Sequence, residues 1–275
     1  GNFLHQELAI LTGAVDAMVV DVQCTMQGLV EVAKNFHTKV ITTSPKAKIS
    51  GAEHIEFDHH HPLEGAKAVV KAAIDNFPNR KETDIPAHSE DLIAGFSHEY
   101  IRYMLGGKFR ASLKPLNENI INGKIQGVAA IVGCNNPRVM HDEGIVNVAR
   151  ELIKNNVLVV VTGCAAGGAA KAGLLQPETI AMAGDGLREV CEATGMPPVL
   201  HLGSCVDNSR ILTILAEMVE TGGLGDDIDQ IPAVGICPEW YCEKPFEIAA
   251  YAVASGCYVL FSGGVSPVAA STEVT

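Results

Sequence analysis

The stretch Pro198-Val199-Leu200-His201-Leu202-Gly203-Ser204-Cys205-Val206-Asp207-Asn208-Ser209-Arg210 decides the expected fold class of this chain. An apolar run leads into a tight Gly-Ser turn, the turn carries Cys205, and a helical pattern begins directly after it. This order predicts a buried strand that ends beside a cysteine. Open α/β sheets bind their ligands outside the carboxyl ends of their strands. Cys205 is therefore a candidate ligand.

Three other segments repeat this pattern of an apolar strand, a cysteine and the start of a helix. They end at Cys24, Cys134 and Cys164. Strands of one sheet lie about 4.8 Å apart, so cysteines that follow neighbouring strands can meet around an object a few ångströms wide. Thiolates favour iron–sulfur clusters, zinc and similar soft ions. With Cys205, these residues predict the converging ligands of one soft metal centre.

Plainer explanations of the cysteines stay open. A single buried cysteine is often only a small core residue. A structural zinc site is less well supported, because such sites usually pair their ligands as C-x₂₋₄-C. The close pair Cys237 and Cys242 is interpreted as two unlinked thiols in a strand-to-helix loop, and Cys191 and Cys257 as ordinary helix and strand residues.

Strands alternate with helices along most of the chain, which requires right-handed crossovers and a parallel sheet. Residues 78–87 are polar and carry two prolines, so they form the expected linker. We therefore expect an α/β protein with two Rossmann-like domains, an incomplete one over residues 1–80 and a second over residues 81–275. The expected strands are 17–22, 39–43, 54–57, 92–96, 127–133, 157–162, 198–202, 233–236 and 258–262. The expected helices are 4–12, 26–36, 62–76, 97–106, 116–121, 143–155, 165–173, 177–194, 207–221 and 243–254.

Composition narrows the class of protein further. The net charge of -12 argues against a nucleic-acid partner, because phosphate binding needs clustered Lys and Arg. No apolar run approaches the roughly 20 residues of a transmembrane helix. Eight cysteines without the spacing of a small disulfide scaffold indicate a reducing compartment, so we expect a cytoplasmic protein. The chain starts at Gly1, without an initiator methionine and almost within a helix, so we expect a fragment of something longer.

Several segments resemble the catalytic subunit of nickel–iron carbon monoxide dehydrogenases. They are residues 11–24, Gly133-Cys134-Asn135-Asn136, Thr162-Gly163-Cys164, residues 202–210 and Glu243-Lys244. Order, spacing and local sequence agree over essentially the whole chain. The resemblance implies a cluster of one nickel, four irons and sulfides, written here as Ni-4Fe-4S. It also implies that Cys24, Cys134 and Cys164 bind irons and that Cys205 binds nickel.

The resemblance assigns the catalytic role to Lys244. Its ammonium would hydrogen-bond bound CO₂ or hydroxide and stabilise developing negative charge, as an oxyanion-hole donor does. A surface lysine at a helix start is the plainer interpretation of this residue. Ile248 lies four residues further on, so it would face the same side of a helix and wall the gas pocket.

The implied activity is anaerobic: CO + H₂O ⇌ CO₂ + 2H⁺ + 2e⁻. The family would add one cysteine and one histidine ligand from upstream of Gly1, together with further 4Fe-4S clusters there. A homodimer and a ferredoxin-type electron carrier are also implied. Because four of six ligands and no electron relay are present, we expect the isolated chain to be inactive. A protein like the hybrid-cluster hydroxylamine reductases and a non-catalytic apo fragment stay open as alternatives.

Histidines offer a second set of candidates with weaker support. His59-His60-His61 lies in a polar loop before a helix and is more simply explained as a solvated loop. Four single histidines could carry protons near neutral pH, although each is also explained as a structural residue. They are His37, His98, His141 and His201, and the last lies closest in sequence to Cys205.

Overall fold

The computed structural model describes residues 2–22 and 24–262, and it divides into two compact units, Gly1–Glu90 and Asp91–Thr275. Each unit contains a sheet of parallel strands with helices in the connections, so the chain has the predicted α/β class. The domain boundary expected after residue 80 falls at the start of a segment, residues 80–97, that contains no helix or strand. The boundary itself stays a prediction.

The first unit is built around a three-stranded sheet in the order β1-β2-β3. Its apolar side chains from α1, β1, α2 and β2 pack into one small core. The core is formed by Ile10, Val20, Leu29, Val30, Ala33, Val40 and Ile49. The elements are α1 (Phe3–Leu11), β1 (Ala17–Val20), α2 (Leu29–Ala33), β2 (Lys39–Thr42), β3 (Glu53–His54) and α3 (Pro62–Asn76).

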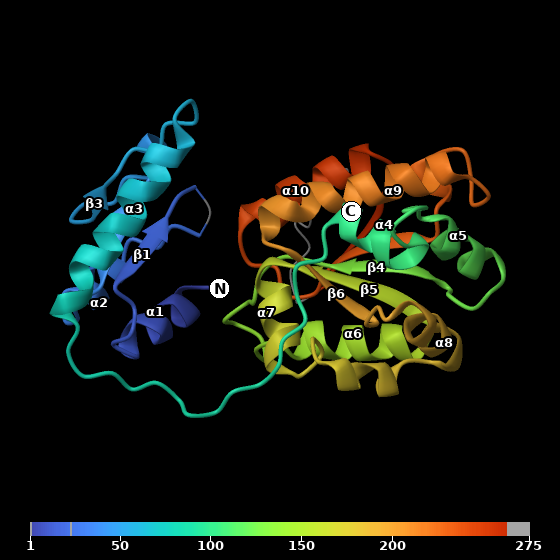
Figure 1. Ribbon diagram of the computed structural model, residues 1–275, viewed down its shortest axis with the longest axis horizontal. Coiled ribbons are helices and arrows are strands. Elements are labelled where there is room, and N and C mark those ends of the chain that lie inside the picture. The colour runs from blue at the N-terminus through green and yellow to red at the C-terminus, as the bar shows by residue number, and fades with distance from the viewer. Residues whose placement is uncertain (1, 23, 263–275) are drawn as a thin grey trace, which may run out of the picture. The chain divides into compact units, whose positions relative to one another are not determined.

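The second unit holds a five-stranded parallel sheet in the order β6-β5-β4-β7-β8. Helices cover both faces, with α6, α7 and α8 on one side and α4, α5, α9 and α10 on the other (Figure 1). Its strands are β4 (Gly127–Ile131), β5 (Val157–Thr162), β6 (Val199–Gly203), β7 (Ala233–Cys237) and β8 (Tyr258–Phe261). Its helices are α4 (His98–Gly106), α5 (Lys114–Ile121), α6 (Glu143–Lys154), α7 (Gly163–Lys171), α8 (Asp185–Thr194), α9 (Asn208–Thr221) and α10 (Glu243–Ala254).

The centre of this sheet is apolar on both faces. Residues 158–161 of β5 are all buried, as expected for an inner parallel strand covered by helices on both sides. The order of strands reverses direction at β4, because the chain adds β5 and β6 on one side and β7 and β8 on the other. Such a switch point opens a crevice at the carboxyl ends of the two strands that flank it. Here those strands are β4 and β7.

Two sequence predictions of secondary structure are wrong. Residues 92–96 form no strand, because Gly95 takes a positive φ of 91° and only isolated hydrogen bonds, such as Phe96 N–H to the His201 carbonyl, attach them. The helix expected over 177–194 is broken into a 3₁₀ turn, Pro177–Met182, and α8. Gly184 is extended between them, and a Cβ there would collide with the Lys154 carbonyl oxygen.

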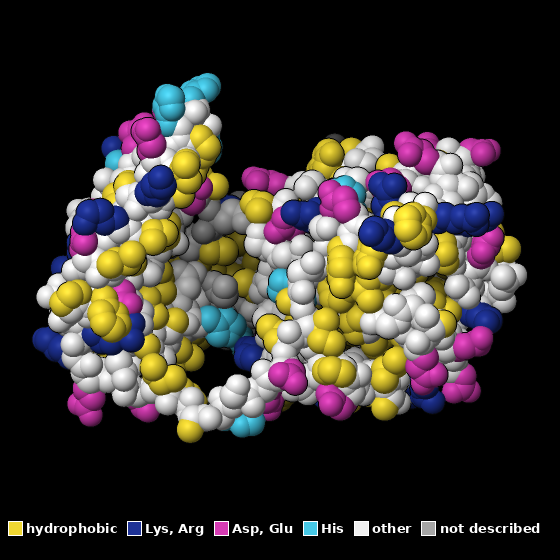
Figure 2. Space-filling view, viewed as in Figure 1, with side chains coloured by type: hydrophobic (Ala, Val, Ile, Leu, Met, Phe, Trp, Pro, Cys, Tyr) yellow, Lys and Arg dark blue, Asp and Glu magenta, His cyan; other side chains and the backbone are white. Residues whose placement is uncertain are grey.

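The surface of the described residues gives little information about function. None of the described helices has the length and apolarity that crossing a bilayer requires. On the face drawn in Figure 2, Lys and Arg side chains are interspersed with Asp and Glu. His59, His60 and His61 are exposed directly before α3, and Figure 2 shows histidine side chains at that end of the first unit.

Candidate metal centre

Five cysteines lie at the carboxyl edge of the second unit's sheet. Cys134 follows β4, Cys164 is the second residue of α7, and Cys205 follows β6 by two residues. Cys237 is the last residue of β7, and Cys242 is the N-cap of α10. Parallel strands end at the same edge, so residues far apart in the sequence arrive at one rim. We call these five residues the thiol rim.

Contacts within the thiol rim join its members in two groups. The Sγ atoms of Cys134 and Cys242 are 3.6 Å apart. Cys164 lies near enough to Cys134 to contribute to its raised pKa, and Cys205 contributes in the same way to the raised pKa of Cys237. Thus three of the four predicted ligands lie at this rim, together with the pair that the sequence analysis interpreted as simple loop thiols.

Close backbone approach brings the neighbouring strand ends together. Gly163 takes a positive φ of 61°, and a Cβ on it would overlap the Sγ atom of Cys205. Gly163 thus admits a neighbour that a side chain would displace, and the start of α7 can approach the turn that carries Cys205. A Cβ on Gly133 would make only an ordinary contact with Pro245 in the first turn of α10, at 3.7 Å.

A carboxylate holds the turn that presents Cys205. Asp207 Oδ2 accepts hydrogen bonds from the Ser204 backbone N–H at 2.8 Å and from the Ser204 hydroxyl at 3.2 Å. Arg210 Nε donates to the other oxygen at 3.0 Å, and this guanidinium holds the pKa of Asp207 below its usual range. The turn between β6 and α9 is therefore closed by its own side chains.

A second carboxylate anchors the loop between β7 and α10. Glu239 is buried and accepts hydrogen bonds from the backbone N–H groups of Asp142 and Gly144, each at 3.0 Å. Asn136 Nδ2 donates to the Trp240 carbonyl at 3.0 Å. These contacts fasten the loop after β7 to the loop after β4. They place Cys242 against Cys134 across the switch point.

Two thiols of the rim, Cys134 and Cys237, resist ionisation. The pKa of Cys134 is raised, first by the hydrogen bond it shares with Cys242 and then by burial, while the Tyr241 backbone opposes the change. Burial raises the pKa of Cys237 to about 12. A soft metal ion binds the thiolate form and removes this penalty. The donor set therefore fits a soft metal centre.

The distances between potential ligand atoms distinguish a metal cluster from a site for a single ion. In the described part of the chain, one group of three or more potential ligand atoms lies within 4.8 Å, and it is His141, Asp142 and Glu239 rather than a set of cysteines. That acidic group is already explained, since Asp142 pairs with Lys171 and Glu239 binds backbone amides. The wider spread of the thiols suits ligands distributed over several metal atoms.

The other predicted site residues are Lys244, Ile248 and Cys24, and each is described within its own unit. Lys244 is half-buried in the first turn of α10, between Cys242 and Pro245, and Ile248 lies one turn further on and is also half-buried. Cys24 belongs to the first unit and lies four residues beyond the end of β1. It takes a positive φ of 51°, and its carbonyl accepts a hydrogen bond from Gln6 at 3.3 Å.

The histidines have different surroundings. His98 lies 3.1 Å from Glu99, and His141 lies 3.2 Å from the Lys171 ammonium. His201 stands in β6, and its Nδ1 atom is buried without a hydrogen-bond partner among the described residues. His37 Nε2 lies 2.9 Å from Asp16 Oδ1, at the opposite edge of the first unit's sheet from Cys24.

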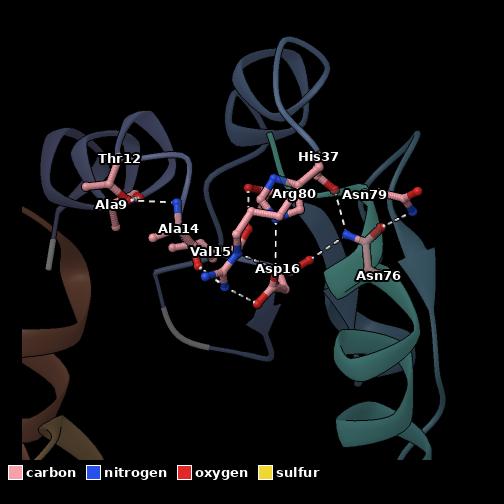
Figure 3. A network of polar contacts seen from close by, with 10 residues as sticks. Ala9, Thr12, Ala14, Val15, Asp16, His37, Asn76, Asn79 and Arg80 are labelled. Atoms are coloured by element: carbon pink, nitrogen blue, oxygen red, sulfur yellow. Dashed lines mark hydrogen bonds and ion pairs between the residues drawn. The ribbon is translucent and has the colours of Figure 1, made fainter. Parts of the chain in front are cut away.

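Asp16 is the centre of a polar network at that amino edge, shown in Figure 3. Arg80 donates to both of its carboxylate oxygens, at 3.2 and 2.5 Å, and this hydrogen bonding is the main reason that the pKa of Asp16 is lowered. Asn76 donates to the backbone carbonyls of Asp16 and His37 at 2.8 and 2.6 Å. The network fastens the end of α3 to the starts of β1 and β2, which is a structural role.

Comparison with known proteins places the whole chain in one family. The model of the Prismane/CO dehydrogenase family matches residues 1–275. Carbon monoxide dehydrogenase 1 of Methanosarcina acetivorans is 52% identical over 277 residues, covering 100% of this chain and 43% of the relative. Carbon monoxide dehydrogenase 1 of Carboxydothermus hydrogenoformans is 47% identical over 268 residues, covering 93% of this chain and 42% of the relative.

Solved structures show the same similarity in three dimensions. The nickel-free crystal structure of carbon monoxide dehydrogenase from Thermococcus sp. AM4 superimposes with a TM-score of 0.87 at 50% identity. The similarity covers 100% of this chain and 43% of the chain in that structure. This chain thus spans less than half the length of the relatives that it matches.

Proposed function

Because the chain belongs to the Prismane/CO dehydrogenase family, we propose that the natural protein carrying it interconverts carbon monoxide and carbon dioxide. The balanced reaction is CO + H₂O ⇌ CO₂ + 2H⁺ + 2e⁻. The thiol rim is the observation that carries this proposal beyond family membership. It offers several soft ligands at the ligand-binding edge of a parallel sheet, where a metal cofactor is expected.

The proposed ligands keep the roles that the resemblance implies. Cys134 and Cys164 are proposed to bind irons, Cys205 to bind nickel, and Cys24 to bind a further iron. When bound, a Ni-4Fe-4S cluster supplies a Lewis-acidic metal pair and accepts the two electrons. Cys164 lies in the first turn of α7, directly after β5.

Lys244 is the proposed catalytic residue. Its place in the first turn of α10, two residues after Cys242, brings its backbone to the thiol rim. Its ammonium would donate hydrogen bonds to a CO₂ or hydroxide oxygen and stabilise the negative charge that develops there. Ile248, one turn further along the helix, is proposed to wall the gas pocket.

The assembly, the location and the electron carrier of the natural protein are proposed on the family resemblance alone. We propose an anaerobic, cytoplasmic homodimer that passes its electrons through additional 4Fe-4S clusters to a ferredoxin-type carrier. The additional clusters are assigned to a part of the protein outside these 275 residues.

Anaerobic purification of the natural polypeptide tests the function directly. We expect nickel and iron in the protein and CO-dependent reduction of a viologen dye, with both lost in Cys205→Ala. The Cys257→Ala variant is the matched control, because Cys257 precedes β8 at the opposite edge of the same sheet. Absence of nickel combined with hydroxylamine reduction would instead identify a hybrid-cluster enzyme. Absence of any bound metal would leave a non-catalytic protein.

A further inference from the structure

We propose that the histidine run His59-His60-His61 forms a second metal site, on the surface of the first unit, that binds Ni²⁺ or another divalent transition-metal ion. All three side chains are exposed, directly before α3. Imidazole nitrogen suits nickel, copper and zinc, whereas Mg²⁺ and Ca²⁺ prefer oxygen ligands. The run belongs to a different unit from the thiol rim, so the inference stands independently of the proposed function.

A turn of the backbone gathers the run. The His61 N–H donates to the Asp58 carbonyl at 3.1 Å, which closes a turn over residues 58–61. The His60 N–H donates to the Asp58 carboxylate at 2.8 Å, an Asx turn that holds the same segment. The first and fourth Cα atoms of such a turn lie within about 7 Å of each other. The three imidazoles therefore start from backbone positions that can reach one ion.

The base of this turn is fixed to the rest of the unit. The Phe57 N–H donates to the carbonyl of Thr43, the residue after β2, at 3.0 Å. The Phe57 ring packs on Gly65 in α3, where an added Cβ would lie only 2.9 Å from it. The His59 ring makes a T-shaped contact with Phe57, with 5.7 Å between the ring centroids. The turn is thus held in one place while the ends of its side chains stay at the surface.

The imidazoles can converge on an ion by changing rotamer. His61 is the N-cap of α3, but its side chain makes no capping hydrogen bond. Among the described residues, the run is not a group whose ligand atoms already lie within 4.8 Å of one another. Exposed side chains turn about their χ angles without displacing packed neighbours, so gathering them costs mainly rotamer freedom.

The charge around the run favours a cation. Residues 49–66 carry the carboxylates of Glu53, Glu56, Asp58 and Glu64 and no Lys or Arg. Glu64 lies in the first turn of α3, where it offsets the positive end of the helix dipole. Carboxylates attract any divalent ion, and the histidines add the preference for a transition metal.

The experiment uses the natural polypeptide without an added histidine tag and with Cys205→Ala, which removes the proposed nickel ligand of the thiol rim. The test variant combines His59→Asn, His60→Asn and His61→Asn. Asparagine is a favourable N-cap, so the start of α3 is kept. The control is His88→Asn, which removes a single exposed histidine from the segment 80–97.

Two measurements report the site. Equilibrium dialysis against Ni²⁺, with and without excess Mg²⁺, gives the amount of bound ion. Modification of histidines with diethyl pyrocarbonate, located by mass spectrometry, shows which imidazoles the ion covers. We expect the triple variant to bind Ni²⁺ at this site at least about tenfold more weakly than its Cys205→Ala parent, because every imidazole ligand is lost. His88→Asn should match that parent, and Mg²⁺ should not displace the nickel. Ni²⁺ should protect residues 59–61 from modification and leave His88 reactive.

Three results would overturn the inference. They are equal Ni²⁺ binding by the triple variant and its parent, complete displacement of Ni²⁺ by Mg²⁺, or equal modification of the run with and without Ni²⁺. Displacement by Mg²⁺ would assign the ion to the carboxylates instead. Because every protein compared lacks Cys205, these results leave the proposed function untouched. Absence of nickel from the centre of the unmutated protein would contradict that function and leave this site standing.

Discussion

At the amino edge of the first unit's sheet, ionisable groups are paired with groups of opposite charge. At the carboxyl edge of the second unit's sheet, they lie next to groups of their own kind. At the amino edge, Asp16 faces Arg80 and His37, so opposite charges and hydrogen-bond donors meet their complements within the chain. At the carboxyl edge, thiols face thiols, and the pKa of Cys134 rises because its nearest partner is another acid. Thiols held together in this way can bind a soft cation, which takes them in their thiolate form.

The largest effect expected from this comparison is at the thiol rim. Cys134→Ala should reduce metal content and CO oxidation by at least about a hundredfold, because a ligand is removed outright. The folded structure without metal should be preserved, as judged by circular dichroism. The matched variant Cys191→Ala removes a buried thiol from α8, away from the rim, and should keep its metal. Equal metal content in both variants would break the comparison.

The next effect concerns the anchor of the β7–α10 loop. Glu239→Ala leaves two partly buried backbone N–H groups without their acceptor, which should lower the free energy of unfolding by about 2 kcal/mol. Urea titration of the metal-free protein measures this loss. The exposed Glu247 in α10 gives a control, and Glu247→Ala should stay within about 0.5 kcal/mol of the parent. Similar losses in the two variants would contradict the anchoring role.

At the amino edge, Asn76→Ala should cost about 2 kcal/mol, because Asn76 is buried and its amide satisfies two backbone carbonyls. Hydrogen exchange should show the loss in the first unit and leave the second unit unchanged. Asn35→Ala removes an exposed asparagine near the same sheet and should change little. Metal content should be normal in Asn76→Ala, since the network holds backbone and carries no ligand.

The smallest expected effect is a pH dependence at the Cys205 turn. The pKa of Asp207 is lowered by Arg210, so its carboxylate adds stability above its unfolded pKa of about 3.9, and this stability is lost as the pH falls. Asp207→Asn should cost about 1 kcal/mol at pH 7 and should flatten the acid-side decline. Asp226→Asn, at an exposed position, should keep the parent's pH profile in urea titrations from pH 3 to about 7.

The sequence predicts the elements of the fold well where a strong local pattern exists. Buried runs such as 157–162 carry their own periodicity, and the strand-end position of Cys134, Cys164 and Cys205 follows from it. The break at Gly184 was not predicted, because it depends on the carbonyl of Lys154 from another element. The failed strand at 92–96 has an apolar pattern, but Gly95 takes a positive φ and only isolated hydrogen bonds join the segment to His201 in β6.

The approach of Cys242 to Cys134 could not be predicted for the same physical reason. Its loop follows a path set by Glu239 and Asn136, whose partners are distant in the sequence. Spacing alone shows only a pair of cysteines around a strand end. The strand order that makes β4 and β7 neighbours is likewise a property of pairing rather than of any local segment. A close Cys-x₄-Cys pair beside a strand end was the one available signal.

Because β7 inserts beside β4 only after β5 and β6 have been made, the thiols of the rim appear in two stages during synthesis. The chain emerges from the ribosome with Cys134, Cys164 and Cys205 well before the segment that contains Cys237 and Cys242. Until β7 inserts beside β4, the early half of the sheet presents three thiols on an open border. Metal delivered during translation would meet that partial rim, whereas metal delivered after release would meet all five thiols.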